Sequence, residues 1–220
     1  MVMECSAVTD HGVKVNGAVP EAFEATVFLC DIRGFTRLLE RTAPAEGFRL
    51  VQKFLERLTA AVVEEGGRVN NLTGDGFLAQ FGGGGADDSR HALRAVNCAI
   101  EMRARLQALN LQRHVVKDPT IAVGIGVHTG QVAGGTVRVG GYSSFLLIGD
   151  TVNVAARIES LTKIFAVDIL LSAQTYARIR DRFTCLTMPP RPVKGKTDEL
   201  ATFWIPPHAK PFRTYDAPAL

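Results

Sequence analysis

The chain has 220 residues, of which 46% are hydrophobic and 21% charged, with a net charge of +3 at pH 7. That length suits one large domain with a substantial core, and the charges are interleaved without a long basic block, so nothing calls for nucleic acid or an anionic membrane as a partner. No apolar run reaches the length of a membrane span, no signal-peptide pattern is present, and the four cysteines are widely spaced, so we expect a cytoplasmic protein with reduced thiols.

Strand and helix patterns follow one another through the first half of the chain. Residues 1–22 have weak periodicity and are interpreted as a lead-in to a domain over residues 23–205. The elements predicted next are a buried strand at 25–30, a helix from about Pro44 to Glu65, strands at 68–72 and 77–81, a helix capped by Asp87 or Asp88, and a strand at 121–127. The dipeptide Asp75-Gly76 accepts the positive backbone angles of a tight turn, so the two short strands are expected to form a β-hairpin.

This order, β-α-β-β-α-β, predicts an α+β fold with a ferredoxin-like βαββαβ core. In that topology the sheet is antiparallel, both helices cover one face, and the first strand is central. A C-terminal αβ extension is expected to complete the domain. Its predicted parts are a strand at 145–148, a helix at 151–161, a strand at 167–171, a helix from about Ser172, strands at 183–188 and 201–205, and a Pro-rich tail at 206–220.

Two acidic residues lie where this topology brings strand ends together. Asp31 directly follows the first strand and Asp75 lies at the hairpin tip, so we expect both at one edge of the sheet. Two carboxylates there repel each other unless they are protonated or bridged by a cation, and oxygen ligands favour magnesium or manganese. Free backbone N–H groups near Gly34 and Thr36, at the start of the next helical segment, favour an anion at the same place. Together these features predict a nucleoside triphosphate site, although singly Asp75 also suits a turn and Asp31 a helix cap.

A second motif, 149-GDTVNVAARIES-160, places Asn153 and Arg157 four residues apart on a predicted helix. Both then project from one face, and their apolar neighbours suggest packing against another element, where an arginine calls for a fixed anion. A surface pair is the alternative. We interpret Asp150 as the N-cap of this helix. In the loop 189–198, Lys194 and Lys196 are either solvated or clamp a triphosphate.

These motifs together resemble the catalytic domain of class III nucleotidyl cyclases, the family of adenylyl and guanylyl cyclases. The similarity runs from about Ala25 to Ile205. The stretches that carry it are 29-LCDIRGFT-36, 73-TGDGFLAQF-81, 124-GIGVHTGQVAGG-135, 148-IGDTVNVAARIE-159 and 193-VKGK-196.

The resemblance implies a role for each matching residue. Asp31 and Asp75 correspond to the family's two metal-binding aspartates, and the backbone carbonyl of Ile32 would add a ligand to one of two Mg²⁺ or Mn²⁺ ions. Asn153 and Arg157 correspond to the asparagine and arginine that act in the transition state. The residues implied in triphosphate binding are Gly34, Phe35, Thr36, Lys194 and Lys196.

The resemblance also implies a homodimer with the site at its interface, the metals on one chain and Asn153 and Arg157 on the other. The expected reaction is attack of the ribose 3′-hydroxyl on the α-phosphorus, which gives a 3′,5′-cyclic nucleotide and pyrophosphate. Asn153 would orient the ribose and Arg157 would stabilise charge on the α-phosphate, so loss of Arg157 is expected to lower turnover by about 10²–10³-fold.

Two positions implied in base contact depart from the family's pattern. Asn71 stands where adenylyl cyclases commonly have lysine, and Leu146 stands where aspartate or threonine is common. Asn71 can address adenine or guanine, whereas Leu146 makes only apolar contact. We favour ATP because adenylyl cyclases predominate among the bacterial-looking members. The alternatives are a guanylyl cyclase, a diguanylate cyclase, against which the second motif and the VKGK loop argue, and a catalytically silent dimer that serves as a regulatory or nucleotide-sensing module.

Overall fold

The computed structural model describes residues 5–8, 14–17, 21–34, 39–40, 42–83, 88–139, 141–191 and 199–207. Within these ranges the chain forms strands and helices with the following bounds: β1 Cys5–Val8, β2 Lys14–Gly17, β3 Glu21–Arg33, α2 Pro44–Glu64, β4 Arg68–Leu72, β5 Gly76–Phe81, α3 His91–Val115, β6 Ala122–Val139, β7 Tyr142–Ile148, α4 Asp150–Ile164, β8 Ile169–Ser172, α5 Ala173–Ile179, β9 Leu186–Thr187 and β10 Thr202–Trp204.

A single mixed sheet joins the strands, and its main path runs β4-β5-β3-β6-β8-β10-β9. The central strand β3 pairs antiparallel with β5 on one side and with β6 on the other. β6 also pairs parallel with β8, and its second half pairs antiparallel with β7. This order confirms the predicted ferredoxin-like core and the C-terminal αβ extension, as well as the central place of the first strand.

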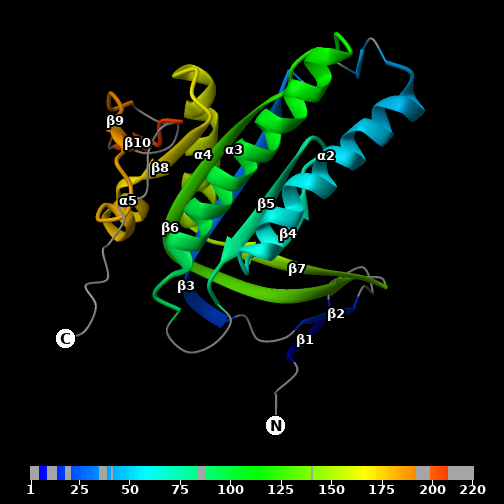
Figure 1. Ribbon diagram of the computed structural model, residues 1–220. Helices are drawn as coiled ribbons and strands as arrows, with labels where there is room; N and C mark the ends of the chain where they lie inside the picture. The colour runs from blue at the N-terminus through cyan, green and yellow to red at the C-terminus, as the bar shows by residue number, and fades with distance from the viewer. Residues whose placement is uncertain are drawn as a thin grey trace, which may run out of the picture.

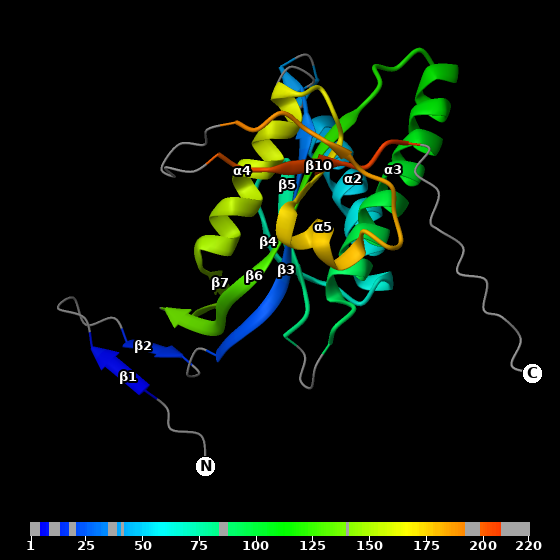
Figure 2. The same ribbon diagram turned by 90° about the vertical axis from the view of Figure 1, so that its left-hand side faces the viewer.

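The molecule has three layers, which Figure 2 shows nearly edge-on: α2 and α3 cover one face of the sheet and α4 covers the other. Figure 1 shows the β6–β7 hairpin leaving these layers as a curved arm, with β1 and β2 beside it. β2 pairs with the far end of β6, from Val15↔Val139 to Gly17↔Val137. In the described parts of the chain, no helix is long and apolar enough to span a membrane.

The main core lies between the sheet and the layer of α2 and α3. Phe28 stacks on Phe77 with ring centroids 6.1 Å apart, and Phe54, Leu58 and Met102 close the core from the helices. α2 forms where expected: Pro44 occupies its first turn, where a missing N–H does no harm, and Gly66, with φ +69°, follows its end. Cys30, Cys98 and Cys185 are free thiols.

α4 lies unusually close to the other face of the sheet. A Cβ on Gly126 of β6 would stand 2.5 Å from the carbonyl oxygen of Ala155 and closer still to the backbone nitrogen of Glu159. Only a glycine lets the helix backbone rest on the strand at this point. The position of every side chain on α4 relative to the sheet is therefore fixed by backbone contact.

Several local expectations were wrong. The hairpin forms, but Gly74 (φ +78°) adopts the left-handed conformation of its turn, rather than Asp75 or Gly76. Asp88 is not a side-chain cap of α3: it pairs with Arg94, and its backbone carbonyl accepts from His91 N, while Asp87 lies outside the described residues. Asp150 is the first residue of α4 and Gly149 holds the N-cap position, so the Asp150 carboxylate lies in the first turn, where the helix dipole favours it.

The predicted strands 121–127 and 183–188 also differ in length from those observed. β6 continues to Val139 because β7 pairs with its second half, and β9 is reduced to Leu186–Thr187. α5 begins where expected, next to Ser172, and the Ser172 hydroxyl caps it by accepting from Thr175 N at 3.1 Å.

Candidate active site

The two aspartates singled out by the sequence meet at one edge of the sheet. Asp31 lies near the end of β3, opposite Gly76 of β5, and Asp75 lies in the β4–β5 turn. Ile32 N donates to the backbone carbonyl of Asp75 at 3.2 Å, which fastens the turn to β3. The two carboxyl groups lie close enough to interact: burial raises the pKa of Asp31, and the neighbouring Asp75 carboxyl raises it further.

The residue after Asp75 makes this approach possible. A Cβ on Gly76 would clash with the carbonyl oxygen of Cys30 and stand 3.1 Å from Asp31 Oδ1. With glycine there, the Asp31 carboxylate can lie against the hairpin. The TGDG sequence therefore has two separate glycine requirements, a left-handed turn at Gly74 and close contact at Gly76.

Such a pair of carboxylates fits a divalent cation, because a cation relieves the repulsion that raises the pKa of Asp31. Across the residues that the structure describes, no group of three or more His, Cys, Asp or Glu side chains is placed to hold a metal. A cation held here by two aspartates would keep free coordination positions for water or phosphate oxygens, as magnesium usually does.

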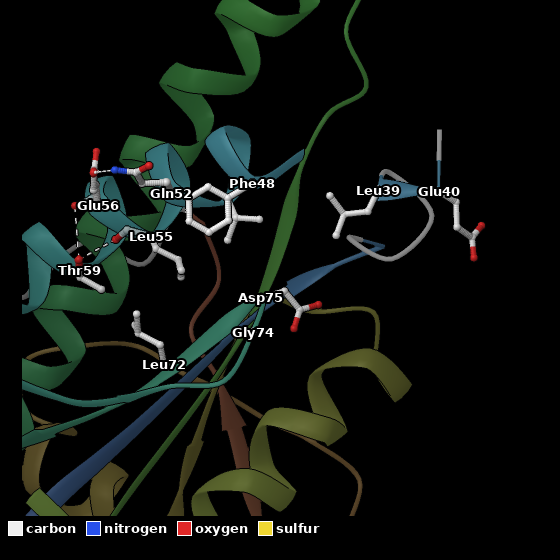
Figure 3. Close-up of a pocket in the computed structure, with 11 residues that line it drawn as sticks. Leu39, Glu40, Phe48, Gln52, Leu55, Glu56, Thr59, Leu72, Gly74 and Asp75 are labelled. Carbon is white, nitrogen blue, oxygen red and sulfur yellow. Dashed lines mark hydrogen bonds between the residues drawn. The ribbon is translucent and has the colours of Figure 1, made fainter. Parts of the chain in front are cut away.

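A cavity of about 940 Å³ adjoins this edge (Figure 3). Its wall on α2 is largely apolar, with Phe48 and Leu55 facing Leu72 of β4, and Asp75 and Gly74 lie at its border. Figure 3 shows the Asp75 carboxylate pointing away from the α2 side chains, toward the side on which Leu39 and Glu40 lie. The turn thus presents a carboxylate beside an apolar surface, a combination typical of small-molecule sites.

The residues implied in triphosphate binding are only partly described. Gly34 is exposed directly after β3 and has φ +68°, so the chain turns sharply there. Phe35, Thr36, Lys194 and Lys196 lie outside the described residues. Their roles stay predictions.

Asn153 and Arg157 lie on the side of α4 that faces away from the sheet. The buried residues of the helix are Thr151, Val154, Ala155, Ile158, Leu161 and Thr162. Asn153 is exposed and Arg157 is half-buried. Its Nη1 atom is buried and, within the described chain, has no hydrogen-bond partner. A guanidinium N–H held without an acceptor is suited to an incoming anion.

The two residues implied in base contact lie on neighbouring strands, since β4 and β7 touch. Asn71 is exposed on β4, and Leu146 on β7 is 51% exposed. A β-bulge between Val69 and Asn71 shifts the register, so that Arg68 opposes Gln80 and Asn71 opposes Leu78. Arg68 and Asn71 therefore share one face of the sheet.

Arg68 was not singled out by the sequence. Its guanidinium carbon lies 4.0 Å from the centre of the Phe145 ring, next to Leu146. Strand alternation alone would place residues 68 and 71 on opposite faces, and the bulge carries no clear sequence signal.

Glu159 is a second residue that the sequence did not single out. It is half-buried on α4 between the sheet-facing positions Ala155 and Thr162. Burial and the charge of Asp31 raise its pKa to about 7. The sequence did contain an indication of this residue, because a carboxylate on the sheet-facing side of an amphipathic helix is costly to bury without a partner or a function.

Comparisons with known proteins agree with this geometry. The family model described as the adenylate and guanylate cyclase catalytic domain matches residues 19–207. The chain is 38% identical over 151 residues to the adenylate cyclase of Anabaena cylindrica, covering 67% of this chain and 29% of that protein. It is 28% identical over 182 residues to adenylate cyclase 1 of Rhizobium meliloti, covering 83% and 27%. The chain thus spans less than a third of the length of these relatives.

Solved structures share the fold. The adenylyl cyclase CyaB from P. aeruginosa matches with a TM-score of 0.78 and 26% identity, over 85% of this chain and 95% of that chain. The guanylyl cyclase Cya2 matches with a TM-score of 0.75 and 27% identity, over 90% and 97%. The guanylate cyclase domain of RhGC from Catenaria anguillulae, in complex with GTP, matches with a TM-score of 0.73 and 27% identity, over 84% and 98%. Since the family model spans most of the chain, the chain belongs to the adenylate and guanylate cyclase catalytic domains, the class III nucleotidyl cyclases.

Proposed function

We propose that this chain, as a homodimer, converts ATP to 3′,5′-cyclic AMP and pyrophosphate. The observation that carries the proposal is the meeting of Asp31 and Asp75, which are far apart in sequence, at the end of the central strand. Two neighbouring carboxyl groups at a sheet edge beside a cavity suit a metal-bound triphosphate.

Each residue then has a defined task. Asp31, Asp75 and the carbonyl of Ile32 hold two divalent cations, Mg²⁺ or Mn²⁺, which when bound lower the pKa of the ribose 3′-hydroxyl and neutralise the phosphates. Arg157 of the partner subunit donates to the oxygens of the α-phosphate as charge builds there, and Asn153 of the partner subunit orients the ribose. The amides of Gly34, Phe35 and Thr36 and the ammonium groups of Lys194 and Lys196 bind the triphosphate.

ATP is favoured because the curated relatives described above are named adenylate cyclases, one of them 38% identical to this chain. At the base, Leu146 packs apolarly and Asn71 donates or accepts through its amide.

GTP is the second candidate, and Arg68 is the observation that favours it. Its donor-only guanidinium shares a sheet face with Asn71, and such a fork matches the two acceptors O6 and N7 of guanine better than the adenine edge.

The deciding experiment is incubation of the purified chain with ATP or GTP, each with Mg²⁺ or Mn²⁺, followed by chromatographic identification of the cyclic product and assay of pyrophosphate. We expect cyclic AMP and pyrophosphate in equal amounts. Cyclic GMP alone would replace ATP with GTP. Absence of both products with either metal would leave the silent regulatory dimer in place of the enzyme.

A further inference from the structure

The helix that carries Asn153 and Arg157 also reaches the aspartate site of its own chain. Two residues beyond Arg157, Glu159 lies over Gly124 of β6, the residue that pairs with Asp31, and the charge of Asp31 raises the pKa of Glu159 after burial has done so. α4 rests on β6 at Gly126, so Glu159 is held at this place by backbone packing.

A third charged group, Arg33, lies near Asp31 and Glu159. Asp31 and Arg33 are two residues apart on β3, so both side chains lie on one face, opposite Gly124 and Ala122 of β6. A Cβ on Gly124 would stand 2.6 Å from Glu159 Oε1 and 3.6 Å from Arg33 Nε. Arg33 Nε is buried and has no hydrogen-bond partner among the described residues, while its Nη2 donates to the carbonyl of Val167.

We propose that Glu159 is a positioning residue of the metal site: it neutralises Arg33, so that Asp31 stays free to bind a divalent cation. This inference rests on the proposed function, because it assumes that Asp31 binds the cation. Lys163, one turn further along α4, is the other cation that acts on Asp31 and Glu159. With Glu159 in place, the carboxylates of Asp31 and Glu159 balance the positive charges of Arg33 and Lys163. Asp75 in the β4–β5 turn adds a third carboxylate.

Without the Glu159 charge, Arg33 remains beside Asp31 as an uncompensated cation. It then competes with the metal for the Asp31 carboxylate and repels the metal directly. With screening by water, at a dielectric constant near 80 and separations of about 6–12 Å, loss of one charge is expected to weaken binding of a dication by about three- to tenfold.

The test measures metal binding itself. Protein-bound Mn²⁺ is counted by electron paramagnetic resonance at pH 8, where Glu159 is ionised, with 3′-deoxy-ATP or 3′-deoxy-GTP, which lack the attacking hydroxyl. The nucleotide alone serves as the blank. The variants are E159Q, the double variant R33Q/E159Q, and D181N as a control that removes one exposed charge beyond α5.

We expect the Kd for Mn²⁺ to rise about three- to tenfold in E159Q, to be unchanged in D181N, and to return within about twofold of the wild-type value in R33Q/E159Q. A double variant as weak as E159Q would overturn the role of Arg33 and the inference with it. Should E159Q fail to fold, the single variant R33Q serves as the test. We expect R33Q to bind Mn²⁺ more tightly than the wild type does, and weaker binding by R33Q would contradict the inference.

The inference and the proposed function fail in different ways. If the wild type binds Mn²⁺ but E159Q binds it equally well, only the inference is overturned. If the wild type binds no Mn²⁺ beyond the blank with either nucleotide, the proposed function is overturned, and the inference goes with it.

Discussion

Asp75 is a destabilising neighbour of Asp31 in the metal-free protein, since its charge adds to burial in raising the pKa of Asp31. We therefore predict opposite effects of D75N on activity and stability. Cyclase activity should fall by about 10²–10³-fold or more, because a ligand of the catalytic cation is lost. The melting temperature in EDTA at pH 8 should equal or exceed that of the wild type.

Activity is measured by cyclic nucleotide formation and stability by calorimetry, with the exposed E56Q on the wall of the same cavity as the matched control. Undiminished cyclisation by a D31N/D75N protein would show that these aspartates hold no catalytic cation.

Glu159 gives the folded protein a particular pH dependence. Its pKa is raised from 4.5 to about 7, first by burial and then by Asp31, so the folded state binds a proton between these pH values that the unfolded state has released. The free energy of unfolding should therefore fall as the pH rises through this window. We predict that, in EDTA, the melting temperature of the wild type drops between pH 5 and pH 8 by about 2–5 °C more than that of E159Q. Parallel pH profiles for the two proteins would contradict this account.

At the scale of elements, the helices and the hairpin were predictable from sequence because their signals are local. Pro44 and the apolar spacing of α2 fix a helix, and the Gly74–Gly76 region fixes a turn. The meeting of Asp31 and Asp75 followed from strand order alone. Glu159 and Arg68 could not be placed in this way, because one depends on how α4 lies on β6 and the other on a β-bulge.

The contact between α4 and β6 makes Gly126 a sensitive position. A methyl group there would collide with the backbone of α4 near Glu159 and Ala155, so the helix must move outward. We predict that G126A lowers the free energy of unfolding by about 1–3 kcal/mol and also lowers activity, because Arg157 and Glu159 move with the helix. Chemical denaturation and the cyclase assay measure the two effects. S160A, on the exposed side of α4, should change stability by less than about 0.5 kcal/mol, and an equally mild G126A would show that α4 does not rest on the strand.

At the scale of the whole molecule, Asn153 is exposed and Arg157 only half-buried in the single chain. The nearby β6–β7 arm exposes Tyr142 and Ile148, at 70% and 53%. Apolar side chains on a projecting hairpin favour association with another chain. In a two-fold dimer any surface that completes one site also completes the other, so two equivalent sites are expected.

This arrangement predicts rescue between two inactive proteins. D75N lacks the metal side of the site and R157A lacks the phosphate side, so each homodimer should be nearly inactive. If the site is shared, a heterodimer has one site with both defects and one with neither. Random exchange in an equal mixture makes half of the dimers heterodimers, and activity should rise to about a quarter of that of the wild type. A mixture of D75N with D31N is the control, because both defects fall on the same side and no exchange can restore a site. If D75N and R157A do not rescue each other although mass spectrometry detects the heterodimer, each chain must build its site from its own residues.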